Sequence, residues 1–198
     1  GTGGGTGPAG EVVDLIRASG GEAVANGADV ADWAQAEAMI AQAVDTFGTL
    51  DVLVNNAGFL RDRTLANMSE EEWDSVIRVH LRGTFCPTTH AVNHWRALAK
   101  AGEDVSGARV INTTSGAGLV GNFGQANYCT AKAGIAGFTQ TVSLELFKLG
   151  ITVNCIGPAG AMSVNPAMQV KMPFDVRKDL TAISGLAQTP FILAAPAS

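Results

Sequence analysis

The sequence has little of what marks a disulfide-rich, membrane-spanning or nucleic-acid-binding protein. Cysteine occurs only three times in 198 residues, aromatic residues make up 6%, and the net charge is −5. The cysteines form no Cys-x-x-Cys pair and no Cys/His group with metal-ligand spacing. No apolar run reaches the roughly 18 residues that a membrane-spanning helix needs. An acidic chain also lacks the basic surface that binds nucleic acid or anionic membranes. We therefore predict a cytoplasmic protein with reduced thiols, no metal, and no nucleic-acid or membrane partner.

Glycine, by contrast, is abundant, with 24 residues. Between the glycines, apolar residues at helical spacing alternate with short apolar runs that are typical of strands. This alternation predicts a Rossmann-type α/β fold, a doubly wound parallel sheet with helices on both faces. The expected helices cover 9–19, 33–47, 69–100 and 126–149, and the expected strands lie around 23–29, 50–54, 108–113 and 152–156.

The length suits one domain, because single cores usually stop growing near ~250–300 residues. We assign residues 1–161 to the Rossmann-type core. Residues 162–198 show no clear periodicity and contain several prolines. We expect them to form an irregular substrate lid or C-terminal segment of the same domain.

Two ionisable side chains fall one helical turn apart near the start of the fourth expected helix. Tyr128, the single tyrosine of the chain, precedes Lys132 by four residues, so both lie on one helix face. A tyrosine phenol normally titrates near ~10, and a neighbouring ammonium that stabilises the phenolate makes it a usable general acid or base. Ser115 follows the strand 108–113, at the sheet edge where open α/β folds bind ligands. Taken singly, these features equally describe an exposed helix pair and a strand-end cap.

Taken together with two further motifs, they resemble the short-chain dehydrogenase/reductase family. The resemblance covers about Val12 to Pro158 and implies a nicotinamide-dependent oxidoreductase. The motifs, in chain order, are Asn55-Asn56-Ala57-Gly58 after a strand, Ser115 thirteen residues before the tyrosine, Tyr128-x-x-x-Lys132, and Asn154-x-x-x-Pro158.

The resemblance implies a role for each site residue. Tyr128 exchanges a proton with the substrate oxygen, Lys132 stabilises the phenolate and binds the nicotinamide ribose, and Ser115 orients the carbonyl. The hydride chemistry itself belongs to the cofactor. The residues implied to contact the cofactor are Asp29 and Val30 at the adenine, together with Asn56, Ala57, Gly58, Thr113, Tyr128, Lys132, Pro158 and Ala159.

The chain departs from the family pattern at two places. Where the family usually has an asparagine that relays protons, this chain has His80, within Val79-His80-Leu81. A histidine donates and accepts hydrogen bonds and can replace asparagine; a packed structural histidine is the alternative. The usual Pro-Gly after the last strand is Pro158-Ala159 here.

Three further segments point to a narrower group. They resemble the (3R)-hydroxyacyl-CoA dehydrogenase unit of peroxisomal multifunctional β-oxidation enzymes and its bacterial single-domain relatives, which share the histidine. The implied substrate is a 3-hydroxyacyl or 3-oxoacyl thioester. Arg61 and Arg63 would serve an anionic CoA moiety, or form a solvated charge cluster. The three segments are residues 60–63, 78–83 and 121–128.

The glycine-rich start, Gly1–Gly7, has the spacing of a dinucleotide fingerprint, but its context is wrong. A true fingerprint follows a first strand and precedes two further strands before the Asn-Asn-Ala-Gly strand. Only one expected strand, around 23–29, separates Gly7 from Leu50. We therefore assign Gly1–Gly7 to a glycine-rich insertion after the second strand, and expect the first β-α-β segment to be absent from this sequence.

These inferences leave several alternatives open. NAD is the expected cofactor and NADP the alternative, because the residue that usually decides lies in the absent segment. Within the enzyme class, a 3-oxoacyl reductase of fatty-acid synthesis and a hydroxysteroid dehydrogenase are the other possibilities. Outside it, the chain would be a non-catalytic remnant that keeps the fold for dimerisation. The long helices predict a homodimer or homotetramer.

Overall fold

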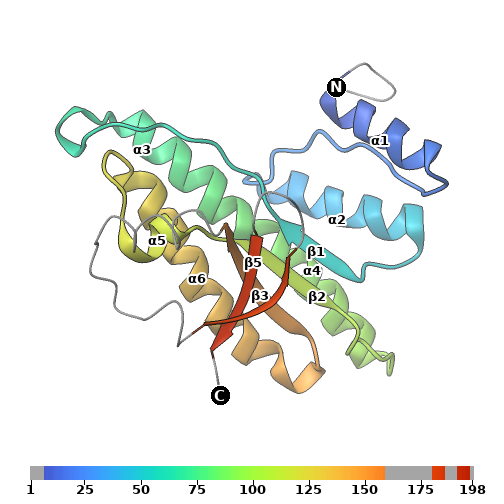
Figure 1. The fold of residues 1–198 in the computed structure, drawn as a ribbon. Helices are drawn as coiled ribbons and strands as arrows, with labels where there is room; N and C mark the ends of the chain where they lie inside the picture. Colours follow the sequence, from blue (N-terminus) through green and yellow to red (C-terminus); the bar gives the residue numbers. More distant parts are fainter. Residues whose placement is uncertain (1–6, 159–179, 186–190, 197–198) are drawn as a thin grey trace.

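The computed structural model describes residues 7–158, 180–185 and 191–196 as a layered α/β structure (Figure 1). The helical elements are α1 (Pro8–Ala18), α2 (Trp33–Phe47), the 3-10 turn η1 (Leu65–Asn67), α3 (Glu70–Ile77), the π-turn η2 (Arg78–Arg82), α4 (Gly83–Lys100), α5 (Gly116–Val120), α6 (Ala126–Leu146) and the 3-10 turn η3 (Phe147–Leu149). The strands are β1 (Val52–Asn55), β2 (Arg109–Thr113), β3 (Thr152–Pro158), β4 (Leu180–Gly185) and β5 (Phe191–Pro196).

The described strands form one sheet in the order β1-β2-β3-β5-β4. Strands β1, β2 and β3 are parallel, with Leu53 paired to Val110 and Val110 to Val153. Helix α4 lies between β1 and β2 in the chain, and α6 lies between β2 and β3. Parallel strands joined by helical crossovers confirm the predicted Rossmann-type α/β class.

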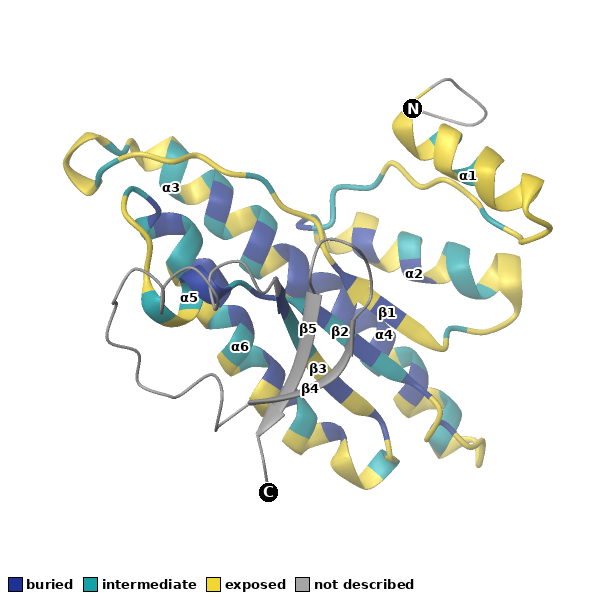
Figure 2. Ribbon diagram, in the orientation of Figure 1, coloured by how far each residue is buried: buried dark blue, intermediate teal, exposed yellow. Residues whose placement is uncertain are grey.

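The main hydrophobic core lies on one face of these three strands. There Leu53, Val110 and Val153 contact the helical layer, whose largest fully buried side chain is Trp95 of α4. The Trp95 indole Nε1 donates to the main-chain oxygen of Leu50 over 2.6 Å. Buried positions accordingly concentrate where the helices meet the sheet (Figure 2). This layer fixes the carboxyl ends of β1 and β2.

The opposite side of β1 carries Val52 and Val54, which are 48% and 55% exposed. Alternate residues of a strand point to opposite faces, so these two valines share one side. The described residues leave that side of β1 open to solvent.

Helix ends follow the sequence signals. The Asp32 side chain accepts from the Gln35 amide at the start of α2, and Ser69 and Glu72 form a reciprocal capping box at the start of α3. Gly48 ends α2 with a φ of 78°. The predicted helix over 69–100 is helical throughout, but the π-turn η2 divides it into α3 and α4.

The predicted strand around 23–29 is wrong: this segment forms no strand. Its polar side chains satisfy the backbone locally instead of leaving it free for a sheet ladder. The Asn26 side chain accepts from the Ala28 amide at 2.7 Å, and the Asp29 carboxylate accepts from the Ala31 amide at 2.9 Å.

The expectation of irregular structure after residue 161 is wrong for two segments. Residues 180–185 and 191–196 form β4 and β5, and β5 pairs antiparallel with the end of β3. The apolar run at 191–196 has no period to detect, and at 180–185 threonine and serine interrupt the apolar residues without a strict alternation. The remainder of 162–198, together with Gly1–Thr6 and Ala159, lies outside the described residues.

The expectations of reduced thiols, no metal and no membrane-spanning helix can be compared with the described part of the chain. Cys86, Cys129 and Cys155 are free thiols. Within the described ranges, no cluster of three or more candidate metal ligands occurs. No described helix has both the length and the apolar character needed to cross a membrane.

Candidate active site

Helix α6 carries the tyrosine and lysine one turn apart. The Lys132 ammonium lies 5.6 Å from the centre of the Tyr128 ring. Although it is charged, Lys132 is only 4% exposed, and its Nζ donates to the main-chain oxygen of Thr113 over 2.6 Å. Burial lowers the pKa of Lys132 to about 8, because removal from water penalises the charged form. The structure therefore places a buried cation beside the single tyrosine.

The end of β2 brings the serine to the same helix. Thr114, next to Ser115, donates its hydroxyl to the main-chain oxygen of Lys132 at 2.8 Å. Ser115 is the N-cap of α5, and its Oγ accepts from the Ala117 amide at 3.2 Å. Its hydroxyl proton thus stays available for a ligand. A Cβ on Gly118 would lie 2.8 Å from the carbonyl carbon of Lys132, so only glycine permits this approach of α5 to α6.

His80 lies between the tyrosine and the turn after β1. Its ring meets the Tyr128 ring edge-on, with centroids 5.2 Å apart, and it is 3% exposed. Nε2 is 2.8 Å from the Phe59 oxygen and 3.1 Å from the Phe59 nitrogen. Nδ1 is buried and has no hydrogen-bond partner among the described residues. Burial lowers the pKa of His80, so the neutral ring, with one donor and one acceptor nitrogen, is favoured.

The turn after β1 presents its backbone to solvent. Asn56, Ala57 and Gly58 are exposed. A Cβ on Gly58 would overlap the His80 imidazole, so glycine is required for the histidine to lie beneath this turn. Asn55, the first residue of the motif, is instead buried, and its Nδ2 donates to Thr88 at 2.9 Å and to Asn112 at 2.8 Å. The motif therefore contributes one structural asparagine and an accessible small-residue turn.

The aspartate and valine predicted to contact adenine lie beside η2. The Asp29 carboxylate accepts from the Arg78 guanidinium at 2.7 Å. This hydrogen bond is the main reason that the pKa of Asp29 lies below its usual value. Val30 packs on Gly83, where a Cβ would come within 2.8 Å of the valine methyl.

These residues fit the nicotinamide–ribose end of a dinucleotide. Among the described residues the Lys132 ammonium makes one hydrogen bond, to Thr113, which leaves two of its three donors for ribose hydroxyls. The Thr113 hydroxyl is buried without a partner among the described residues. Pro158 ends β3 at the same sheet edge, whereas Ala159 lies outside the described residues. A ligand that brings hydroxyls and an amide would satisfy these groups.

No sequence pattern indicated a role for Asn127. Asn127 is fully buried at 0% exposure, directly before the tyrosine. Its Nδ2 donates to the main-chain oxygens of Arg61 at 3.0 Å and Glu72 at 2.9 Å, and its Oδ1 accepts from the Tyr128 amide at 2.8 Å. A polar residue in the first turn of a helix is usually exposed, so nothing in the pattern signals this role.

The two arginines considered for CoA are both engaged by the protein. Arg63 forms an ion pair with Glu72 at 3.0 Å. The Arg61 guanidinium lies 4.8 Å from the centre of the Phe59 ring. Both side chains belong to exposed residues, so a ligand can still reach them.

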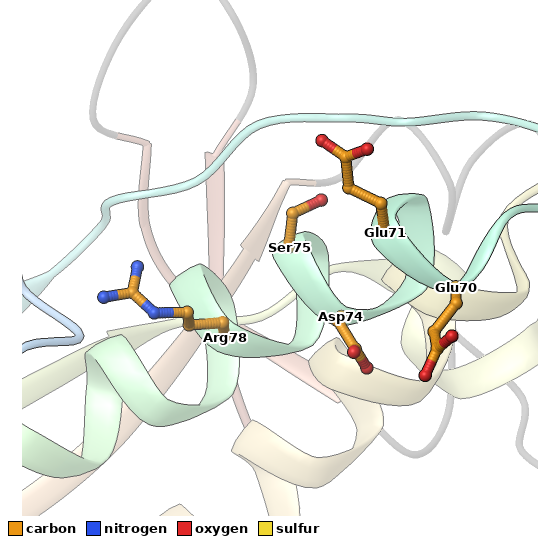
Figure 3. A pocket seen from close by; sticks show the side chains of 5 residues that line it. All are labelled: Glu70, Glu71, Asp74, Ser75 and Arg78. Carbon is orange, nitrogen blue, oxygen red and sulfur yellow. The ribbon is translucent and has the colours of Figure 1, made fainter.

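A separate hollow lies on α3, lined by the side chains shown in Figure 3. Three of its five lining residues are acidic, and none is one of the predicted catalytic residues. The lining residues are Glu70, Glu71, Asp74, Ser75 and Arg78.

A parallel α/β sheet with a serine, a tyrosine and a buried lysine at its carboxyl edge defines a class of oxidoreductases that bind dinucleotides. The family model for short chain dehydrogenases matches residues 5–172. The chain therefore belongs to the short chain dehydrogenase family.

Several relatives and one solved structure are similar to the chain. It is 49% identical over 155 residues to hydroxyacyl-CoA dehydrogenase ChsB1 of Mycobacterium tuberculosis, covering 76% of this chain and 49% of that one. It is 47% identical to a 3-oxoacyl-[acyl-carrier-protein] reductase of Synechocystis, covering 74% and 57%. It is 44% identical to mouse peroxisomal multifunctional enzyme type 2, covering 80% and 20%. A crystal structure of a short chain dehydrogenase from Mycobacterium avium matches with 59% identity and a TM-score of 0.73, covering 75% of this chain and 50% of that chain.

The chain spans about half the length of the first two of these relatives. Their names place the family resemblance near hydroxyacyl-CoA dehydrogenases and 3-oxoacyl reductases, in agreement with the narrower group inferred from the sequence.

Proposed function

We propose that the chain is an oxidoreductase that transfers a hydride between a nicotinamide cofactor and a secondary alcohol or ketone, with a 3-hydroxyacyl or 3-oxoacyl thioester as substrate. The observation that carries this proposal is that the Lys132 side chain is buried and that its ammonium lies 5.6 Å from the centre of the Tyr128 ring. Burying a charged group costs free energy, and a lysine without a function in the site would avoid that cost by remaining exposed to water. The relatives' names support the acyl-thioester class.

In the proposed mechanism, Tyr128 is the general acid or base. For alcohol oxidation its phenolate accepts the hydroxyl proton, and for ketone reduction its phenol returns a proton to the carbonyl oxygen. Lys132 stabilises the phenolate by its positive charge. The Ser115 hydroxyl donates to the substrate oxygen and fixes its orientation. The nicotinamide ring, when bound, accepts or supplies the hydride.

His80 is the proposed fourth member. Its Nε2 is held by the main chain of Phe59, which leaves Nδ1 buried without a described partner. A neutral imidazole with one free nitrogen can pass a proton along a hydrogen-bonded chain. We assign His80 to relay protons between the tyrosine–lysine pair and water, in place of the usual asparagine.

NAD is the proposed cofactor and NADP the alternative. Asn56, Ala57 and Gly58 follow β1, Thr113 ends β2 and Pro158 ends β3, at the carboxyl edge where α/β folds bind dinucleotides. Lys132 and Thr113 would hold the ribose, and Asp29 would accept a hydrogen bond from the adenine amino group. The full proposed set is Asp29, Val30, Asn56, Ala57, Gly58, Thr113, Tyr128, Lys132, Pro158 and Ala159.

The decisive experiment separates turnover from cofactor binding. We expect Tyr128→Phe to lower kcat by at least about 100-fold on a 3-hydroxyacyl-CoA, because the phenylalanine cannot transfer a proton. NADH binding, followed by fluorescence, should stay close to the wild-type affinity. Thr130→Ala, an exposed position on the same helix, is the control and should change neither value. Full activity of Tyr128→Phe would contradict the mechanism.

The same measurements distinguish the alternative functions. A fatty-acid-synthesis reductase would prefer an acyl-carrier-protein thioester over the CoA thioester, and a steroid dehydrogenase would prefer neither. A dimerisation remnant is favoured by Leu144 of α6 and Phe147 of η3, which are 80% and 79% exposed. Such a remnant would self-associate in light scattering and bind no NADH. The enzyme is proposed to be a homodimer or homotetramer that also binds NADH.

A further inference from the structure

The π-turn η2 directs alternate side chains toward two different loops. Arg78 and Arg82 reach the segment 29–31, whereas His80 between them reaches Phe59 and the Tyr128 ring. Residues four apart on a helix lie close together, and a residue between them faces elsewhere. The five residues of η2 therefore hold both loops in one fixed relation.

The segment 29–31 is held from several sides. Arg78 donates to one carboxylate oxygen of Asp29 at 2.7 Å, and the Ala31 amide donates to the other at 2.9 Å. Arg82 donates through Nε to the main-chain oxygen of Ala31 at 2.9 Å. The segment belongs to no strand, so apart from the packing of Val30 on Gly83 it depends on such side-chain and turn hydrogen bonds for its position.

The ion pair orients the Asp29 carboxylate and leaves it available. An ionised carboxylate offers about four acceptor positions, and the described contacts use two of them. The side chain of Asp29 is 39% exposed, so a ligand can reach the others. A guanidinium on one oxygen also restricts rotation of the carboxylate, which lowers the side-chain entropy that would be lost on binding.

We propose that Arg78 is a positioning residue for the adenine half of the cofactor, acting through Asp29. This inference rests on the proposed function, because it takes Asp29 as the acceptor for the adenine amino group. In this proposal Arg78 contacts Asp29 and neither the reacting atoms nor the cofactor. It therefore acts on dinucleotide affinity and leaves the proton-transfer step to His80, two residues further along η2.

The test compares a ligand that has an adenine half with one that lacks it. NADH and reduced nicotinamide mononucleotide both fluoresce, and only NADH carries adenine. For Arg78→Gln we expect the Kd for NADH to rise up to about fivefold, the scale of a partly exposed ion pair. The Kd for the mononucleotide and kcat at saturating NADH should not change. Arg78→Lys should restore part of the NADH affinity.

Two controls make the result specific. Arg96→Gln removes an exposed arginine of α4 and should leave both dissociation constants at wild-type values. Asp29→Asn should weaken NADH binding, and adding Arg78→Gln to it should cause little further loss, because both act through one carboxylate.

The outcomes separate this inference from the proposed function. If Arg78→Gln binds NADH as tightly as the wild type, or loses affinity for both ligands equally, the positioning role is overturned and the proposed function stands. Fully additive losses in the double variant would also overturn it. If the wild-type chain binds neither ligand, the proposed function fails and this inference fails with it.

Discussion

Helices α1 and α6 were both expected from the sequence, yet they differ completely in what they bury. Helix α1 begins at a proline and has apolar residues at helical spacing, but none of its residues is buried. Helix α6 has a much weaker amphipathic pattern and buries Ile135, Val142 and Leu146. Leu15 of α1 is 69% exposed, against 2% for Leu146.

The difference shows that apolar periodicity predicts local conformation and not burial. A helix buries a side chain only where a neighbour approaches closely enough to exclude water. Helix α6 has such neighbours partly because it carries glycine: a Cβ on Gly134 would lie 3.1 Å from the Leu81 side chain. No described element takes a similar position against the apolar side of α1.

The largest expected effect tests this comparison with one substitution in both helices. Leu146→Ala should lower the free energy of unfolding by about 2–5 kcal/mol, because it leaves a cavity in the core. Leu15→Ala should change it by no more than about 0.5 kcal/mol, as exposed positions do. Urea unfolding followed by circular dichroism measures both. A loss at Leu15 comparable to that at Leu146 would mean that α1 is covered in solution.

Much of the fold and part of the site followed from the sequence. The helices with clear caps and the strands of the parallel sheet were predicted, because their signals are local. The segment 23–29 was not, because Asn26 and Asp29 satisfy the backbone by contacts that apolar periodicity does not register. The grouping of Ser115, Tyr128 and Lys132 came from resemblance; the hydrogen bond from Lys132 to Thr113 joins residues far apart in the chain and required the structure.

A second prediction asks whether α6 positions its tyrosine by burial or by hydrogen bonds. Asn127→Ala removes the partner of the Arg61 oxygen and of the Tyr128 amide, and one of the donors to the Glu72 oxygen. We expect a loss of about 1–3 kcal/mol in the free energy of unfolding, the usual cost of buried unsatisfied groups. Asn93→Ala, at an exposed position of α4, is the matched control and should be close to neutral. Equal effects of the two substitutions would remove the special role of Asn127.

The smallest expected effect is a contribution to stability that increases with pH, the direction expected of a buried cation. The pKa of Lys132 is lowered from 10.5 to about 8 by burial. Between these two values the unfolded chain keeps the proton and the folded chain releases it, so the unfolded state binds more protons. Stability contributed through Lys132 therefore rises as the pH increases across this window, and is lowest below it, where the folded protein must bury the charge.

Lys132 alone can change the free energy of unfolding by at most about 1.4 kcal/mol per pH unit. Residual access of water to the site should keep the measured change well below that value. Urea unfolding at pH about 8 and about 9.5 should show a smaller rise in stability for Lys132→Met than for the wild type. Lys100→Met, which removes an exposed lysine of α4, should keep the wild-type slope. If Lys132→Met also kept the wild-type slope, Lys132 would be hydrated in solution. The contrast between the buried helix α6 and the exposed helix α1 would then fail at the residue on which the proposed chemistry depends.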